Sequence, residues 1–246
     1  MVSHKLKFLE HISELRSRLI NIIICYVITF IICCYFNDKI YYFVVIPLAT
    51  ALGTKSNFIY TGLTEAFFSS LRISTKFALI VTLPYISFQI YRFIEPGLYK
   101  NEKLIIKLLL ISAQFLFFIG ISFVYYLVMP KAFEFFLTFQ KDTVDYSLNL
   151  EPRISEYISI VIDLVFAFGI AFQLPIIILI LVSLRVIGSE TLKLKRRIAI
   201  LLIFIIAGII TPPDVVSQLL LAFPLLALYE ITIIFAKSIE SRRHDA

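Results

Sequence analysis

The sequence predicts an all-α integral membrane protein, one domain over residues 1–246 with six transmembrane helices. The first observation is composition: 60% of the residues are hydrophobic and 16% are charged, whereas soluble domains have about 45–50% and about 25%. The second is a series of apolar runs that approach the roughly 20 residues needed to cross a bilayer. The third is that basic residues cluster beside alternate runs, which is a signal of membrane orientation and not of nucleic-acid binding.

The first three predicted spans cover residues 19–36, 77–91 and 108–129. A charged amphipathic segment precedes the first span, and basic residues bound the second and third. A cleaved signal peptide is the alternative for the first run, but the flank that follows is bulky and carries no small-residue cleavage site.

The fourth predicted span, residues 157–184, is about 42 Å long as a helix, so it must tilt or kink. Pro175 predicts the place of the kink because proline removes a backbone donor. The fifth and sixth spans, residues 198–210 and 219–235, are predicted to be short, with Glu230 interrupting the sixth. Short spans thin the bilayer locally or leave polar ends inside it.

The segment between the first two spans, residues 37–76, is long for a connection. Its sequence predicts a break at Pro47 and then a short amphipathic helix over residues 64–76 that rests at the membrane interface. The simplest role for this helix is a cap.

Basic residues indicate the orientation of the chain. The termini and the loops that begin at Arg92 and Arg185 carry fifteen Lys and Arg residues: Lys5, Lys7, Arg16, Arg18, Arg92, Lys100, Lys103, Arg185, Lys193, Lys195, Arg196, Arg197, Lys237, Arg242 and Arg243. The opposite loops carry seven: Lys39, Lys55, Arg72, Lys76, Lys131, Lys141 and Arg153. The positive-inside rule therefore predicts that both termini are cytoplasmic, or stromal or matrix-facing in an organelle.

The sequence contains no recognised active site. The three cysteines lie in or at the end of the first apolar run, and the three histidines lie near the termini without metal-ligand spacing. Walker A, GxSxG and HExxH motifs are absent from the sequence. We therefore expect neither an enzyme nor a bound metal or cofactor.

Acidic residues mark a candidate surface on the cytoplasmic side. Glu14 lies in the amphipathic segment before the first span, and Glu95 and Glu102 lie in a loop with apolar residues. Such a surface suits a basic, hydrophobic peptide. The alternative for Glu14 is an ion pair with Arg18, four residues later on the same helix.

Polar residues inside the predicted spans are candidates because charges are rare in a bilayer. Asp163 is either hydrated near the outer interface or functional. Gln173 is suited to a hydrogen bond across helices or to a partner. Asp214, after Pro212 and Pro213, is suited to capping the next helix.

Two classes of function remain open from the residues alone. One is a proton-coupled transporter of small molecules or ions that uses Asp163, and the other is a receptor or channel component for polypeptides. Transporters commonly contain internal repeats with matching broken helices. The short fifth and sixth spans have no counterpart among the first three, which favours the polypeptide class.

Four separated motifs resemble the TatC family, the polytopic subunit of the twin-arginine translocase. They are HISELRSRL at residues 11–19, FIEPGLY at 93–99 with Glu102, AFGIAFQLP at 167–175 and TPPDVVSQ at 211–218. The resemblance covers essentially the whole chain in order, and it agrees with the six spans and the orientation deduced above.

The resemblance implies a receptor for twin-arginine signal peptides that exports folded proteins across an energy-transducing membrane, driven by the proton-motive force. It implies single-span TatA/TatB-type partners, a homo-oligomer within a larger complex, and no catalytic residue. The membrane would be the plastid thylakoid or mitochondrial inner membrane for an organelle-encoded chain, and otherwise the bacterial plasma membrane. The alternative is a proton-coupled small-molecule secondary transporter.

The resemblance also implies roles for individual residues. Glu14 and Glu102 match the acids that engage the arginines. The surface around them is shaped by Arg16, Phe93, Pro96 and Leu98. Structure or partner contacts are implied for Pro47, Tyr125, Gln173, Pro212, Pro213 and Asp214. The family often has Glu where this chain has Gln173, so a hydrogen bond is retained there without a titrating carboxylate.

Overall fold

The structure is a computed structural model that describes residues 2–52, 59–97, 99–138, 141–142, 147–148, 153–210 and 215–244. Its helices are α1 (Val2–Tyr35), α2 (Asn37–Leu52), α3 (Glu65–Ile94), α4 (Lys100–Phe123), α5 (Met129–Leu137), α6 (Ile154–Ala171), α7 (Leu174–Ser183), α8 (Ser189–Leu194), α9 (Arg196–Ile210) and α10 (Val215–His244). A π-helical segment, Val124–Val128, joins α4 to α5. Two-residue strands, β1 (Lys141–Asp142) and β2 (Ser147–Leu148), form a short antiparallel ladder, and the all-α prediction is otherwise confirmed.

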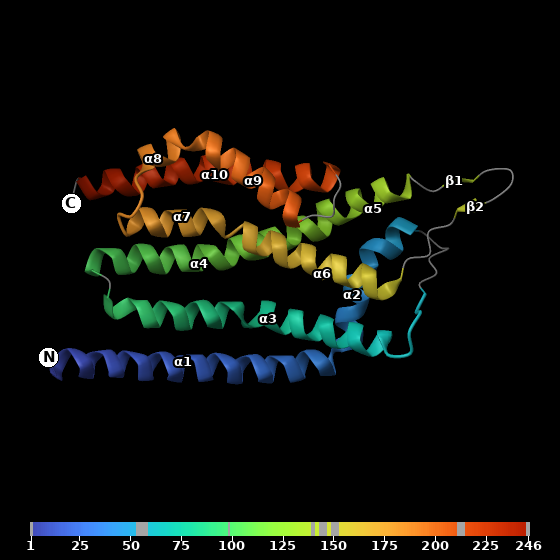
Figure 1. Ribbon diagram of the computed structural model, residues 1–246, viewed down its shortest axis with the longest axis horizontal. Helices are drawn as coiled ribbons and strands as arrows, with labels where there is room; N and C mark the ends of the chain where they lie inside the picture. The colour runs from blue at the N-terminus through green and yellow to red at the C-terminus, as the bar shows by residue number, and fades with distance from the viewer. Residues whose placement is uncertain are drawn as a thin grey trace.

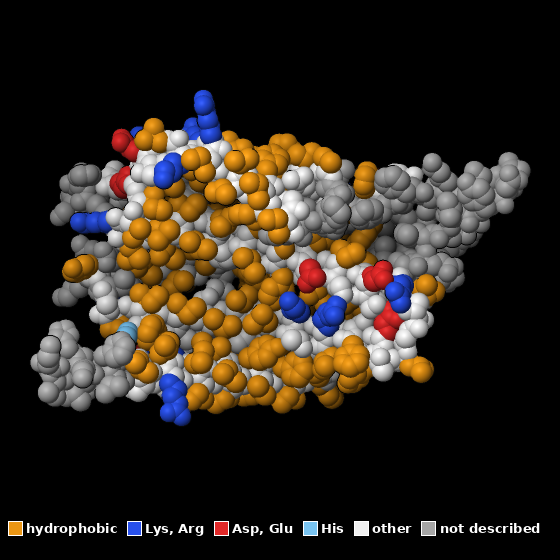
Figure 2. Space-filling model, in the orientation of Figure 1, with side chains coloured by type: hydrophobic (Ala, Val, Ile, Leu, Met, Phe, Trp, Pro, Cys, Tyr) orange, Lys and Arg blue, Asp and Glu red, His pale blue; other side chains and the backbone are white. Residues whose placement is uncertain are grey.

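The long helices lie side by side along one axis, and both termini lie at the same end of the molecule (Figure 1). Five stretches are long and apolar enough to cross a membrane: His11–Tyr35, Glu65–Gly97, Lys103–Phe135, Ile154–Ser183 and Ser217–Ser241. Hydrophobic side chains spread over the described part of the face in Figure 2, as expected for a surface in contact with lipid. The chain is therefore an integral membrane protein.

The core is centred on α6 and α7. Helix α6 packs against α3 and α4, and α7 packs against α4 and α10. Ile158 and Phe168 of α6 are completely buried. A Cβ atom on Gly169 would lie 2.5 Å from the ring of Phe117, so only glycine allows α4 and α6 to approach this closely.

The predicted kink in the fourth span is confirmed. Helix α6 ends at Ala171 and α7 begins at Leu174, with Pro175 in the first turn of α7. Proline is favoured at this place because the first N–H groups of a helix have no partner inside the helix.

Three predicted boundaries are wrong. Residues 64–76 do not form a separate interfacial helix, because α3 runs without interruption from Glu65 to Ile94. The chain does not break at Pro47, which lies inside α2. Helix α10 continues past Glu230 to His244, so the short helix that the sequence predicted is found in α9, with 15 residues, and not in α10, with 30.

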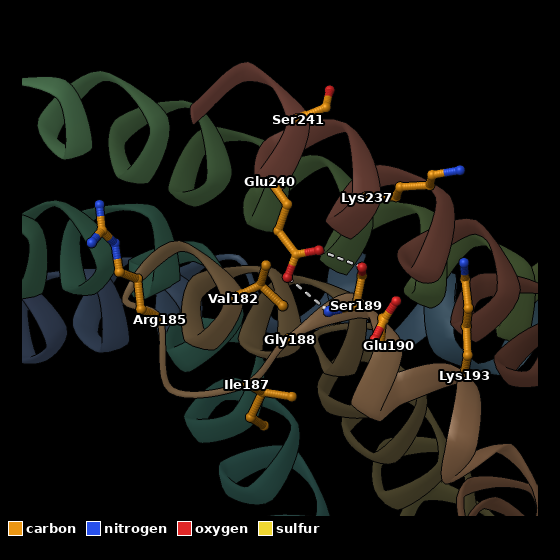
Figure 3. A pocket seen from close by; sticks show the side chains of 10 residues that line it. All are labelled: Val182, Arg185, Ile187, Gly188, Ser189, Glu190, Lys193, Lys237, Glu240 and Ser241. Atoms are coloured by element: carbon orange, nitrogen blue, oxygen red, sulfur yellow. Dashed lines mark hydrogen bonds between the residues drawn. The ribbon is translucent and has the colours of Figure 1, made fainter. Parts of the chain in front are cut away.

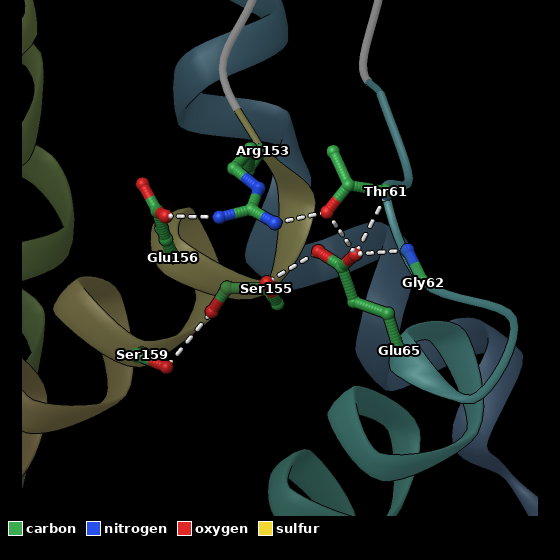
Figure 4. A network of polar contacts seen from close by, with 7 residues as sticks. All are labelled: Thr61, Gly62, Glu65, Arg153, Ser155, Glu156 and Ser159. Atoms are coloured by element: carbon green, nitrogen blue, oxygen red, sulfur yellow. Dashed lines mark hydrogen bonds and ion pairs between the residues drawn. The ribbon is translucent and has the colours of Figure 1, made fainter.

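A polar network joins the starts of α3 and α6 (Figure 4), which lie away from the two termini (Figure 1). Oε2 of Glu65 accepts hydrogen bonds from the backbone N–H groups of Thr61 and Gly62 at 2.8 and 3.0 Å. Oε1 of Glu65 accepts a hydrogen bond from the Ser155 hydroxyl at the start of α6. Arg153 joins the network by donating to Thr61. The segment before α3 is thereby fixed to α6.

Candidate functional site

The carboxylate of Glu14 and the guanidinium of Arg18 meet on α1. Nε and Nη2 of Arg18 both donate to Oε1 of Glu14, at 3.0 and 2.5 Å. The i,i+4 ion pair that the sequence offered as an alternative for Glu14 is therefore present. It engages one oxygen of the carboxylate.

Arg18 also reaches across to α3. Its Nη1 donates to Oε1 of Gln89 at 3.2 Å, and its Nη2 donates to the carbonyl oxygen of Arg92 at 3.2 Å. Gln89 is buried, and its Nε2 donates to the Tyr85 hydroxyl at 2.7 Å. Neutral acceptors on α3 thus hold the guanidinium in place independently of Glu14.

The second carboxylate oxygen of Glu14 remains available. Within the described part of the chain, the contact of Oε2 is with Nδ1 of His11 at 3.7 Å, and the Glu14 side chain is 38% exposed. The His11 ring stacks on Phe93 with ring centroids 4.5 Å apart. A partly exposed carboxylate next to the stacked rings of His11 and Phe93 suits a cationic ligand, with Oε2 as the acceptor that Arg18 does not occupy.

The loop after α3 forms the neighbouring part of this surface. Glu95, Pro96 and Gly97 form a 3₁₀ turn in which Pro96 is exposed. Oε1 of Glu95 lies 4.0 Å from Nζ of Lys103 on α4.

The remaining predicted peptide-binding residues are less completely described. Arg16 is exposed on α1. Leu98 lies outside the described residues, as does the side chain of Glu102 in the first turn of α4. The structure therefore brings Glu14 and Phe93 together through His11, and the approach of Glu102 to Glu14 stays a prediction.

The structure describes some of the residues predicted for structure or partner contacts and not others. Pro47 is buried in α2, and the Tyr125 hydroxyl donates to the carbonyl oxygen of Phe43 at 2.9 Å. Nε2 of Gln173 donates to the carbonyl oxygen of Ala113 at 2.9 Å, which links the α6–α7 kink to α4. The motif over residues 212–214, with Pro212, Pro213 and Asp214, lies outside the described residues.

Sequence reasoning missed Gln89 and His11 as parts of the site. Gln89 is 71 positions from Arg18, and only the packing of α1 on α3 brings the two together. The sequence shows His11 without metal-ligand spacing and as the first residue of the motif at 11–19, and it assigns this histidine no contact. Its place three residues before Glu14 on a helix was the signal that it faces the same carboxylate.

A polar cavity of about 780 Å³ lies apart from this surface, between α7, α8 and α10 (Figure 3). The carboxylate of Glu240 is engaged there by the backbone N–H of Ser189 at 2.8 Å and by the Ser189 hydroxyl. Arg185 lies on the opposite side of the cavity from Lys193 and Lys237, so the cations do not converge on one point. This arrangement joins α10 to α8 and forms no evident binding site.

The described residues of this surface are suited to binding a ligand. Among them, no group of three or more His, Cys, Asp or Glu side chains could hold a metal ion. The site contains a carboxylate, a fixed guanidinium and aromatic rings, which bind ligands through charge and shape.

Comparison with known proteins gives a consistent result. The family described as "Sec-independent protein translocase protein (TatC)" matches residues 10–224. A relative named Sec-independent protein translocase protein TatC, from Rickettsia prowazekii (strain Madrid E), is 51% identical over 96% of this chain and 94% of its own length. The protein of the same name from Escherichia coli (strain K12) is 36% identical over 93% of this chain and 87% of its own length.

A solved structure is also similar. The crystal structure described as "Twin Arginine Translocase Receptor- TatC" superimposes with a TM-score of 0.76 and 37% identity, covering 94% of this chain and 99% of that one. The matches in sequence and in structure extend over nearly the whole length. The chain therefore belongs to the TatC family.

Proposed function

We propose that this chain is the receptor subunit of a twin-arginine translocase, and that Glu14 and Glu102 bind the paired arginines of signal peptides on folded cargo. The observation that carries the proposal is the partly exposed Glu14 carboxylate, with Oε1 held by Arg18 and Oε2 near His11, whose ring stacks on Phe93. The similar solved structure is described as a twin-arginine translocase receptor.

The chemistry of arginine supports this proposal. A guanidinium presents a planar fork that matches a carboxylate, and each charge-assisted hydrogen bond contributes about 1.5–3 kcal/mol. Two acids on one surface therefore supply selective binding without catalysis. Lysine, as a point charge, would not reproduce the paired hydrogen bonds.

We also propose that α9 crosses the membrane in addition to the five long apolar stretches, which makes six spans in all, and that both termini are cytoplasmic. Five stretches meet the length and composition of a membrane span, and an odd number of crossings would put the termini on opposite sides. The common end of both termini in Figure 1 and the excess of Lys and Arg beside it support an even number.

The partners of the chain belong to the same proposal. Single-span TatA/TatB-type subunits and further copies of this chain would assemble on its lipid-facing helices, and the proton-motive force would drive transport. Family membership favours this function over the proton-coupled solute transporter that the sequence left open.

The test is a double-mutant cycle in the affinity of the purified protein for a synthetic twin-arginine peptide. Glu102→Gln in the chain is combined with Arg→Gln at each arginine of the peptide. Each single change should weaken binding about ten- to a hundredfold, and a coupling energy should appear for one arginine. Glu190→Gln, which removes an exposed acid outside the site, is the control. Additive losses without coupling would place the receptor site elsewhere.

A further inference from the structure

Two basic side chains and one acidic side chain lie along the exposed seam between α3 and α6. Arg72 and Lys76 are one helical turn apart on α3, and Nη1 of Arg72 donates to the Ser159 hydroxyl of α6. Nζ of Lys76 lies 4.6 Å from the centroid of the Phe166 ring, also on α6. Asp163 is four residues after Ser159 and three before Phe166, so it shares their face of the helix. Figure 2 shows acidic and basic side chains together within a mainly hydrophobic region.

These three charges do not form ion pairs with one another. The ion pairs found within the described part of the chain include none of Arg72, Lys76 and Asp163. Arg72 and Asp163 are exposed, and Lys76 is half-buried. Charges within a membrane-spanning stretch are costly unless they meet a partner. A ligand with both a negative and a positive group would complement all three.

The depth of the charges in the membrane indicates the class of this ligand. The stretches Glu65–Gly97 and Ile154–Ser183 are about 50 and 45 Å long as helices, and the hydrocarbon of a bilayer is about 30 Å thick. If both are centred on the hydrocarbon, they extend about 10 and 8 Å beyond each of its edges. Lys76 and Asp163 lie about 16 and 14 Å from the first residues of their helices, and therefore about 6 Å inside the edge. Lipid headgroups lie just outside this level, within reach of Arg72 and of the long Lys76 side chain.

A cavity of about 240 Å³ lies beside these charges, between α2, α3, α4 and α6. Lys76 and Phe166 form part of its wall, and its other lining residues are hydrophobic, among them Phe77, Ile80 and Phe118. Phe77 and Ile80 follow Lys76 toward the middle of α3, so the cavity extends from the level of the charges toward the centre of the bilayer. A helix, about 10–12 Å in diameter, could not enter it, whereas a single acyl chain can.

We propose that this site binds one molecule of phosphatidylethanolamine. Arg72 and Lys76 bind its phosphate, Asp163 binds its ammonium group, and the first part of one acyl chain lies in the cavity. With both termini cytoplasmic, the lipid belongs to the outer leaflet, because the site lies near the starts of α3 and α6, away from the termini (Figure 1). The site is separate from the Glu14 surface, so the inference goes beyond the proposed function.

The two signs of charge select this headgroup among common phospholipids. Phosphatidylcholine has a phosphate but no N–H group that could donate to Asp163. Phosphatidylglycerol has a phosphate but no cation. The primary ammonium group of phosphatidylethanolamine donates charge-assisted hydrogen bonds to a carboxylate, while its phosphate accepts them from Arg72 and Lys76.

The test measures lipid binding by tryptophan fluorescence, because the sequence contains no tryptophan. Phe118→Trp places a reporter in the cavity wall, and Phe115→Trp is the control reporter, because Phe115 is exposed on the same helix but does not line the cavity. Each full-length variant is purified in a maltoside detergent, which has neither phosphate nor ammonium. Brominated phosphatidylethanolamine, phosphatidylcholine or phosphatidylglycerol is then added, since bromine quenches tryptophan. Phosphatidylethanolamine should quench the Phe118→Trp reporter at about a three- to tenfold lower concentration than the other two lipids, and all three should quench Phe115→Trp alike.

Three further substitutions, made with the Phe118→Trp reporter, separate the parts of the site. Arg72→Gln and Lys76→Gln should each weaken all three lipids about three- to tenfold, because all three carry a phosphate. Asp163→Asn should weaken phosphatidylethanolamine alone, and should reverse its order with phosphatidylglycerol, because two cations then remain without an anion. Lys39→Gln is the matched control, since Lys39 also lies over a phenylalanine ring, at 5.5 Å, but does not line the cavity. It should leave all three affinities unchanged.

Three results would overturn the inference. One is equal quenching of the Phe118→Trp and Phe115→Trp reporters by every lipid, which would mean that the cavity holds no specific lipid. Another is tighter binding of phosphatidylglycerol than of phosphatidylethanolamine while Asp163 is present. The third is an unchanged affinity in the variant that combines Arg72→Gln and Lys76→Gln. None of these measurements uses a signal peptide, so their failure is distinct from a failure of the proposed function.

Discussion

The hydroxyl of Tyr125 donates a 2.9 Å hydrogen bond to the carbonyl oxygen of Phe43, the acceptor that Pro47 leaves without its helical donor. In an α-helix the N–H of residue 47 would bond to the carbonyl of residue 43, and proline has no N–H. The Tyr125 ring also stacks on Phe43 with centroids 4.4 Å apart. This contact gives Pro47 and Tyr125 one shared structural role.

Tyr125→Phe should destabilise the protein by about 0.5–1.5 kcal/mol. The substitution keeps the stacked ring and removes the donor, so the carbonyl of Phe43 is left without a partner. The measurement is the free energy of unfolding in detergent.

Pro47→Ala provides the control for this prediction. Alanine restores the backbone N–H, so Tyr125→Phe should be nearly neutral in the Pro47→Ala background. A cost of Tyr125→Phe that is the same in both backgrounds would show that the hydroxyl does not compensate for the proline.

This compensation explains why α2 continues through Pro47, although the sequence predicted a break there. Local rules say that proline ends a helix, and the donor that removes the penalty is the hydroxyl of Tyr125, 82 positions after the Phe43 carbonyl that accepts from it. The kink before Pro175 was predictable because the span was too long and the proline lies at a new helix start. The length of α10 could not be predicted, since Glu230 is paired with Arg196 at 2.9 Å and does not end the helix.

Only part of the candidate site could be predicted from the sequence. The pair of Glu14 and Arg18 follows from helical spacing alone. The contacts of Arg18 with Gln89 and Arg92 depend on how α1 packs on α3, which spacing within one helix does not determine.

The six-span topology is tested with reporter fusions. Reporters after Lys39 and within residues 211–214 should label from the outer side, and reporters after Lys195 and at the C-terminus should label from the cytoplasmic side. Labelling of the 211–214 position from the cytoplasmic side would mean that α9 does not cross the membrane.

Gly169→Ala should destabilise the contact between α4 and α6 by about 1–3 kcal/mol, because the new Cβ would lie 2.5 Å from the buried ring of Phe117. Thermal unfolding in detergent gives the measurement. Gly62→Ala is the control, since its new Cβ would lie 3.8 Å from the Cβ of Glu65, an ordinary contact. The pair Gly169→Ala and Phe117→Leu should recover part of the loss, and no recovery would mean that the close approach to Phe117 is not the cause.

Arg18→Gln should weaken binding of a twin-arginine peptide about tenfold. The change removes the hydrogen bonds of Arg18 to Glu14 and to Gln89, so the Glu14 carboxylate is no longer held in one orientation and α1 loses this contact with α3. Arg18→Lys should weaken binding less than Arg18→Gln, because lysine keeps the positive charge beside Glu14. Some loss should remain, because lysine cannot donate to Glu14, Gln89 and the Arg92 carbonyl together. Arg196→Gln, which breaks an arginine–glutamate pair outside the site, is the control and should leave the affinity unchanged. Tighter binding by Arg18→Gln would mean that Arg18 competes with the peptide for Glu14 and does not orient its carboxylate.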